Sequence, residues 1–304
     1  MKLVTYQSAS GPRAAGLRGD ELIDLNQADA GLPACLKALL AEGEAGLQRA
    51  AIAVARGTPL AMRNVRLLAP IPHPQKVICV GLNYIDHARE SGVEPPPEPV
   101  LFNKFPTSVA AHEDAIQLPT VSDQIDYEAE LVVVIGKGGK HIAADEAFSR
   151  IAGYCCGHDV SARDWQLRKP GGQWLMGKTF DGFAPFGPTL VTKDEAGDPG
   201  DLRIALRLNG QTMQDSNTKQ LIFSVPKLVA YISQVTTLMP GDVIFTGTPP
   251  GVGMARKPPV FLQPGDVVDA DPRIISNLIV DQTLNNPAAI LAALKFAGSE
   301  DLTG

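Results

Sequence analysis

The chain has 304 residues, of which 44% are hydrophobic, a net charge of −6 and a pI near 5.4. This length suits one large domain, or a large and a small one, with a core big enough to enclose a catalytic cavity. No block of Lys or Arg occurs, and no apolar run approaches the ~18 residues of a membrane-spanning helix, so neither a nucleic-acid nor a membrane partner is expected. A small-molecule partner is expected instead.

Two features bear on the compartment in which the protein works. The first residues, MKLVTYQSASGPRAAG, have no apolar stretch after the charged start, which argues against a secretory signal and favours a cytoplasmic location. The four cysteines have neither zinc-site spacing nor the density of a disulfide scaffold, so buried free thiols are expected at Cys35, Cys79, Cys155 and Cys156.

Residues 1–70 predict a small α/β accessory domain. Strand-like segments occur at residues 2–6 and 22–25. The helical spacing i, i+3, i+4, i+7 recurs at Leu47, Ala50, Ala51 and Val54. Regular structure then ends at three closely spaced prolines, Pro70, Pro72 and Pro74. We therefore place a domain boundary there.

Residues 71–284 predict a catalytic domain that is mainly β. Strands are expected where β-branched runs are bounded by Gly, Pro or Asp, at residues 77–80, 131–135, 243–246 and 267–268. Asn209 and Gly210 separate two alternating segments, and this pair is the preferred two-residue hairpin turn because both positions need a positive φ.

One clear helix interrupts these strands. It begins at Ser224 as N-cap, has Pro226 in its first turn, and is expected to bury Val225, Leu228, Val229 and Ile232 on one face. Residues 285–304 are expected to form a C-terminal helical tail. The fold class is therefore α+β, mainly β.

Three acids are the candidate metal ligands. Glu128 and Glu130 lie two apart at the start of an apolar strand, so both carboxylates face the same side, and a hard cation such as Mg²⁺ would neutralise them. Asp159, in GHDVSARDWQ, is the third. A solvated strand edge is the ordinary alternative for the glutamates, and a helix cap for Asp159. Asp164 is expected to have a structural role, and Asp126 is left unassigned.

Two further groups are candidates for catalysis. His87 and Glu90 are three residues apart, so on a helical turn the carboxylate can orient the imidazole for activation of water. A solvated surface pair is common at this spacing and, from the spacing alone, is the favoured interpretation. Gly92 and the prolines after it suggest a segment that closes over a site. Lys178 follows Gly177 in WLMGKTFDGFAP. The chain contains neither a phosphate-binding P-loop motif nor the G-x-S-x-G motif of serine hydrolases.

Taken in order, GLNYIDHARE, DYEAELVVVIGK, GHDVSARDWQ, GKTFDGFAP and PGDVIFTGTPPGVG resemble the fumarylacetoacetate hydrolase superfamily, over about residues 76–280. The sequence looks closest to the domain-containing protein 2 branch, on the basis of HDVSARDWQ, GKTFD and TPPGVGMARKPPVFL.

The resemblance implies a mixed β-roll, a homodimer, and Mg²⁺ or Mn²⁺ bound by Glu128, Glu130 and Asp159. Its motif matches assign the lid dyad to His87 and Glu90, the active-site lysine to Lys178, and substrate-binding groups to Arg163, Gln166 and Thr248. Some relatives carry a fourth acid near the first strand of the domain. The corresponding segment here, VICVGLNY, contains none, so three protein carboxylates are expected.

For function, the sequence favours hydrolysis of the C3–C4 bond of a 2,4-diketo acid, such as an acylpyruvate or a 2,4-diketo-3-deoxy sugar acid. Pyruvate and a carboxylic acid would form through a metal-bound enolate, with His87 and Glu90 activating water. The alternative is an oxaloacetate decarboxylase or tautomerase, or a 2-keto acid isomerase, on the same site. A metal-stabilised scaffold without turnover is disfavoured, because a structural site needs neither this dyad nor Lys178.

Overall fold

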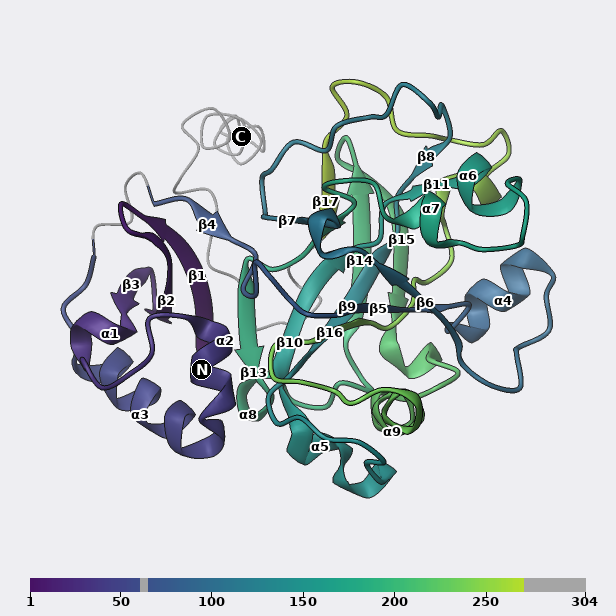
Figure 1. Ribbon diagram of the computed structural model, residues 1–304. Coiled ribbons are helices and arrows are strands. Elements are labelled where there is room, and N and C mark those ends of the chain that lie inside the picture. Colours follow the sequence, from purple (N-terminus) through teal and green to yellow (C-terminus); the bar gives the residue numbers. More distant parts are fainter. Residues whose placement is uncertain (61–64, 271–304) are drawn as a thin grey trace, which may run out of the picture.

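The computed structural model describes residues 1–60 and 65–270 of the chain (Figure 1). The helical tail expected at 285–304 and the end of the domain expected over 71–284 lie outside the described residues. Within the described part, no helix is both long and apolar enough to cross a membrane.

A ten-stranded sheet organises the molecule. Its members are β1 (Lys2–Ser8), β2 (Gly11–Arg18), β3 (Glu21–Asp24), β4 (Leu67–Leu68), β5 (Val77–Gly81), β6 (Val100–Lys104), β9 (Ala129–Ile135), β10 (Ile151–His158), β13 (Thr189–Thr192) and β16 (Val243–Phe245). The strand order is β3-β2-β1-β13-β10-β9-β16-β5-β6, with β4 paired to β1. All neighbours are antiparallel except β16 and β5. The sheet is therefore mixed, and β9 and β10 lie at its centre.

The other strands form separate small sheets: β7 (Val109–Ala110), β8 (Ile125–Asp126), β11 (Ser161–Ala162), β12 (Ala184–Pro185), β14 (Arg203–Leu208), β15 (Gln211–Asn217) and β17 (Val268–Ala270). The helices are α1 (Leu25–Ala28), α2 (Leu36–Ala41), α3 (Gly43–Arg56), α4 (Ile85–Ser91), α5 (Ala147–Arg150), α6 (Arg163–Leu167), α7 (Leu175–Lys178), α8 (Lys193–Ala196) and α9 (Val225–Val235). In Figure 1, α1, α2 and α3 lie at one side of the molecule and α4 at the other. Strands outnumber helices, and the expected α+β, mainly β class is confirmed.

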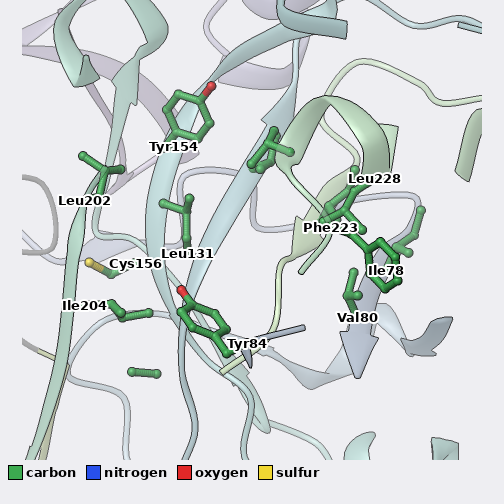
Figure 2. Packing of buried hydrophobic residues seen from close by; sticks show 14 of the residues in the cluster. Ile78, Val80, Tyr84, Leu131, Tyr154, Cys156, Leu202, Ile204, Phe223 and Leu228 are labelled. Atoms are coloured by element: carbon green, nitrogen blue, oxygen red, sulfur yellow. The ribbon is translucent and has the colours of Figure 1, made fainter. Parts of the chain in front are cut away.

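Strand β9 is buried on both faces, which explains its uninterrupted apolar sequence. Leu131 and Val133 point into the first core cluster, whereas Val132 and Val134 point into the second. Figure 2 shows the first cluster, in which Leu131 lies among side chains from several strands and from α9. The period-2 alternation of β9 consequently continues to Glu130, which shares the second-cluster face with Val132.

The local expectations are largely confirmed. Asn209 and Gly210, with φ of 52° and 79°, join β14 to β15. Helix α9 begins directly after Ser224, and its buried residues include the four predicted ones, Val225, Leu228, Val229 and Ile232. In α3 the prediction is wrong at one position, because Ala51 is exposed and Ala53 is buried. The buried face of the helix, which contains Gly46, Ala50 and Ala53, is rotated by part of a turn from the predicted one.

Residues 1–60 share the main sheet with the rest of the chain. Leu3 of β1 pairs with Leu190 of β13, and both belong to the second core cluster. That cluster also includes Leu36 of α2 and Phe245 of β16. The boundary at residue 70 stays a prediction about sequence organisation, since packing joins the two sides of it.

The thiols follow the expectation at three positions. Cys79, Cys155 and Cys156 are buried thiols outside any disulfide, and the last two lie in different core clusters, as neighbours on a strand should. Cys35 is exposed, so its predicted burial is wrong. It occupies the N-cap position of α2, where the side chain lies outside the packed face of the helix.

Candidate active site

The three predicted metal ligands come together at one end of the β9–β10 pair. The register places Glu130 opposite Gly157, and the backbone N–H of Asp159 donates to the carbonyl of Glu128 at 2.9 Å. One carboxylate oxygen from each of Glu128, Glu130 and Asp159 lies within 4.8 Å of the others, and all three residues are buried. The solvated-edge and helix-cap alternatives therefore do not describe these acids.

Lys178 lies beside this triad. Its Nζ donates to Glu128 Oε2 at 2.8 Å and to Asp159 Oδ2 at 3.0 Å. The lysine ends α7, which packs against α6 at Gly177; a Cβ added there would come within 2.3 Å of the backbone nitrogen of Gln166. Glycine at 177 thus allows the close helix contact that brings Lys178 to the acids.

Arg163 forms the second cationic contact to Glu128. Its Nη2 lies 2.7 Å from Glu128 Oε1, its Nε donates to Asp126 Oδ2 at 2.7 Å, and its Nη1 donates to Gln166 Oε1 at 2.9 Å. Asp126 also accepts from the backbone N–H of Gly253 at 2.7 Å. Asp126, unassigned from the sequence, therefore fixes Arg163 and does not join the triad.

Lys104 is a buried residue of the site that sequence reasoning missed. It ends β6, and its Nζ lies 2.6 Å from Asp159 Oδ1 while donating to the carbonyls of Val160 and Phe183 at 3.0 and 2.7 Å. Burial, followed by the charge of Lys104, lowers the pKa of His158 to about 3, so this histidine is neutral. No local spacing in FNKFP indicates this role, which arises from the pairing of β5 with β6.

The buried charges do not balance. Four acids, Asp126, Glu128, Glu130 and Asp159, face three bases, Lys104, Arg163 and Lys178. Among the described residues no Lys or Arg forms an ion pair with Glu130, whose Oε2 accepts only from the N–H of Gly247 at 2.8 Å. The site therefore carries one uncompensated carboxylate.

The pKa values follow from this arrangement. Burial, together with the charges of Asp159 and Glu128, raises the pKa of Glu130 well above its usual range. Burial also acts to raise the pKa of Glu128, but Lys178 and Arg163 outweigh it and lower that pKa. Burial alone would lower the pKa of Lys178, whereas Asp159 and Glu128 raise it, so the amine stays an ammonium.

The donor set fits a hard divalent cation. Three carboxylates supply only oxygen ligands, the chemistry that Mg²⁺ and Mn²⁺ prefer. Glu130 has no cationic partner among the described residues, and its raised pKa favours the protonated form, so a bound cation would take the place of that proton. The residues that would bind it are Glu128, Glu130 and Asp159.

The predicted dyad forms on α4. His87 Nδ1 lies 3.1 Å from Glu90 Oε2, and the two side chains are 14% and 30% exposed, so the pair is partly enclosed. Both carboxylate oxygens of Glu90 accept from the N–H of Gly251, at 3.0 and 3.1 Å. Among the described residues no hydrogen bond or ion pair joins the dyad to the triad. The two groups are connected through the turn that follows β16, where Gly247 donates to Glu130.

Thr248 and Gln166 are buried near the acids and already have protein partners. The Thr248 hydroxyl donates to the carbonyl of Ala129 at 2.9 Å and accepts from Gln214 Nε2 at 2.8 Å. Gln214 Oε1 in turn accepts from the N–H of Ala129 at 2.8 Å. Gln214, unrecognised in the sequence, thus braces the residue between the two glutamates. Substrate contact by Thr248, Gln166 and Arg163 stays a prediction. Asp164 accepts from Ser122 Oγ at 2.5 Å, consistent with its expected structural role.

An apolar wall adjoins the ammonium of Lys178. Its Nζ lies 5.1 Å from the ring centroid of Phe102, and Trp174 meets Phe102 edge-on at 5.5 Å. Trp174 also covers Gly81, where a Cβ would come within 2.3 Å of the indole. The wall lowers the local dielectric and strengthens charge interactions at the site.

Residues 76–280 match the family model described as fumarylacetoacetate (FAA) hydrolase, C-terminal. A Xenopus laevis protein named oxaloacetate tautomerase fahd2, mitochondrial, is 50% identical over 273 residues, covering 88% of this chain and 86% of its own. The Homo sapiens protein named oxaloacetate tautomerase FAHD2A, mitochondrial, is 51% identical over 254 residues, covering 83% and 81%. The solved structure of fumarylacetoacetate hydrolase (EaFAH) from Exiguobacterium antarcticum superposes with a TM-score of 0.78 at 36% identity, covering 89% and 95%.

The match spans the acids, the dyad helix and the central strands, and the solved structure shares the fold, which places the molecule in a class of enzymes with this mainly β fold. The chain belongs to the fumarylacetoacetate hydrolase family, and within it to the domain-containing protein 2 branch. The resemblance of the five motifs and the expected β-roll are confirmed.

One expectation is wrong. The Xenopus laevis and Homo sapiens relatives are named as mitochondrial proteins, which contradicts the cytoplasmic location inferred from the N-terminus. The inference relied on the absence of an apolar stretch. Mitochondrial targeting segments are amphipathic and rich in Arg and Ser, so that absence does not bear on them.

Proposed function

We propose that this enzyme tautomerises oxaloacetate, interconverting its keto and enol forms at C2 and C3, with Mg²⁺ or Mn²⁺ bound by Glu128, Glu130 and Asp159. The observation that carries the proposal is the contact of the Lys178 ammonium with two of these three acids, at 2.8 and 3.0 Å. A proton donor therefore lies beside the position where a chelating 2-keto acid would place its C2 oxygen. The names of the Xenopus laevis and Homo sapiens relatives support tautomerisation over the hydrolysis first favoured.

A bound cation would supply Lewis-acid polarisation of the C2 carbonyl and neutralise the excess negative charge of the site. The protein supplies the proton positions. In the keto-to-enol direction, His87 takes a proton from C3 and the Lys178 ammonium gives one to the C2 oxygen. The C3–H electron pair becomes the C2=C3 bond, and the carbonyl π pair becomes the O–H bond. The enol-to-keto direction retraces these transfers, and no water attacks carbon.

Glu90 supports the charge that forms on His87. Its carboxylate accepts from the imidazole at 3.1 Å and is oriented by the N–H of Gly251. The Phe102 and Trp174 wall limits solvent next to Lys178 and thereby strengthens the electrostatic stabilisation of the developing enolate.

The test follows the enol absorbance of freshly dissolved oxaloacetate with Mg²⁺ and, in parallel, the release of pyruvate. We expect accelerated loss of enol without pyruvate. Lys178→Met should lower kcat at least about a hundredfold, the cost of removing one stabilising donor. Lys169→Met is the matched control, because Lys169 stacks over Trp165 at 4.4 Å and does not contact the acids. Wild-type enzyme that leaves the enol decay unchanged would refute the proposal.

Hydrolysis of a 2,4-diketo acid is the second candidate. The observation that favours it is the His87–Glu90 pair, which could activate water. The solved structure named fumarylacetoacetate hydrolase supports it at the level of the family. Pyruvate released from an acylpyruvate, with loss on His87→Ala, would establish this activity; oxaloacetate decarboxylation would instead release pyruvate from oxaloacetate.

A further inference from the structure

The backbone of Gly251 connects the dyad helix to the body of the protein. On one side its N–H donates to both oxygens of Glu90. On the other side its carbonyl accepts from the Tyr127 hydroxyl at 3.2 Å and from Arg256 Nε at 3.3 Å. The N–H and the carbonyl of Gly251 belong to the two peptide planes that meet at its Cα, so a fixed carbonyl restrains the direction of the N–H through the φ and ψ angles of Gly251.

The surroundings of Gly251 leave its backbone little room to rotate about φ and ψ. Its φ is 102°, and a Cβ would lie 2.1 Å from the carbonyl oxygen of Met213 in β15. The same carbonyl accepts from Arg256 Nη2 at 2.6 Å, and Arg256 Nε also donates to the Tyr127 hydroxyl at 3.0 Å. The Arg256 guanidinium thus contacts three segments: β15 at Met213, Tyr127 just before Glu128, and the turn at Gly251.

Helix α4 depends on few such contacts. It is seven residues long, and no side chain caps its N-terminus. Besides Glu90 and Gly251, a polar contact from its first turn reaches β15, where Ser216 Oγ donates to Asp86 Oδ2 at 2.5 Å. Loss of the Gly251 contact would therefore leave Glu90, which is 30% exposed, free to turn into solvent and away from His87.

We propose that Arg256 is a positioning residue for the reaction: by binding the carbonyl of Gly251 it directs the Gly251 N–H to Glu90, and so fixes the His87–Glu90 pair. The expected loss of kcat on substitution of Arg256 rests on the proposed function. The expected loosening of α4 does not depend on turnover. The proposal predicts a coupling between Arg256 and Glu90, which do not contact each other.

The experiment compares Arg256→Met, Arg256→Lys and Tyr127→Phe with Arg18→Met. Arg18 is the matched control because its guanidinium also donates to backbone carbonyls, those of Val54, Ala55 and Gly57, far from the site. We expect Arg256→Met to lower kcat about tenfold to a hundredfold, as displacement of a catalytic group does, with KM and Mg²⁺ affinity nearly unchanged. Arg256→Lys should recover part of the rate, and Arg18→Met should keep all of it.

Two readouts separate positioning from general destabilisation. In the Glu90→Gln background Arg256→Met should cause no further loss of kcat, whereas fully multiplied losses would overturn the proposal. Hydrogen exchange of residues 85–92 should become faster in Arg256→Met and stay unchanged in Arg18→Met; unchanged exchange in Arg256→Met would overturn it as well. If Arg256→Met does not fold, Tyr127→Phe gives the same two tests. If wild-type enzyme lacks tautomerase activity, the proposed function fails while the exchange measurement still decides on Arg256.

Discussion

At the scale of single residues, the chemistry of the site depends on the charge of Glu130. This carboxylate is buried without a cationic partner among the described residues, a state that costs free energy in the metal-free protein. Its neighbours Glu128 and Asp159 contact Lys178, whereas Glu130 accepts only a backbone N–H.

We therefore expect Glu130→Gln to unfold at equal or higher temperature than wild type without metal, and to lose the additional stabilisation that Mg²⁺ or Mn²⁺ gives to wild type. Thermal unfolding with and without the cation measures both effects, and calorimetric titration measures the affinity. A variant that keeps wild-type affinity would show that Glu130 is not a ligand.

A second residue-scale prediction concerns stability and pH. Asp24 is buried, and although burial acts to raise its pKa, hydrogen bonds from Arg13 and Tyr6 lower it below the usual range. Because the folded-state pKa lies below the unfolded one, this carboxylate stabilises the fold above the unfolded pKa, and the stabilisation is lost as pH falls through the folded pKa.

Asp24→Asn should therefore cost about 1–3 kcal/mol of unfolding free energy at neutral pH, and the difference from wild type should shrink in acid. Urea unfolding at a series of pH values tests this expectation. Asp20→Asn, at an exposed position in the preceding turn, is the control and should cost little. A constant difference at all pH values would contradict the assignment.

At the scale of elements, the contact between α6 and α7 decides whether Lys178 reaches the acids. Gly177→Ala would place a methyl group 2.3 Å from the backbone nitrogen of Gln166, which cannot move aside as a flexible side chain can. We expect α7 to be displaced, with a loss of about 1–3 kcal/mol in stability and of at least about tenfold in kcat. Met176→Ala, in the same helix but 52% exposed, should change neither quantity much. Equal activity of both variants would show that the close approach is not needed.

At the scale of the whole molecule, residues 1–60 and the central strands share one core. Leu36 of α2 and Phe245 of β16 belong to the same cluster, and β1 pairs with β13. Both tryptophans, Trp165 and Trp174, lie in the later part of the chain, so their fluorescence reports on that part alone.

Leu36→Ala should consequently shift the tryptophan-detected unfolding transition, by about 2–5 kcal/mol, although the substitution lies in the N-terminal region. Ile52→Ala, 54% exposed on α3, is the control and should leave the transition unchanged. If Leu36→Ala shifted only the unfolding transition detected by circular dichroism and left the fluorescence transition unchanged, residues 1–60 would fold as an independent unit.

The sequence by itself determined the features that depend on neighbours a few residues apart. The Asn209–Gly210 turn requires positive φ, and α9 follows from a proline in its first turn and a 3.6-residue period. The strand period predicted that Glu128 and Glu130 lie close together, which they do, although Glu128 directly precedes β9. The order of the five motifs along the chain also identified the fumarylacetoacetate hydrolase family. Two expected burials were wrong. The buried face of α3 includes Ala53 and not Ala51, because a helix can rotate against its core without changing its period. Cys35 is exposed because it occupies the N-cap position of α2.

Only the tertiary structure decided which distant groups meet. Lys104 reaches Asp159 through the pairing of β5 and β6, Asp126 fixes Arg163 across 37 residues, and Arg256 reaches Tyr127 across 129. No spacing rule contains these contacts, since they depend on strand register and on close backbone approaches at Gly177 and Gly251. Residue types and local periods therefore made the acids candidates for a metal site, while the packing of separate strands created the charge imbalance that raises the pKa of Glu130 and would favour a bound cation.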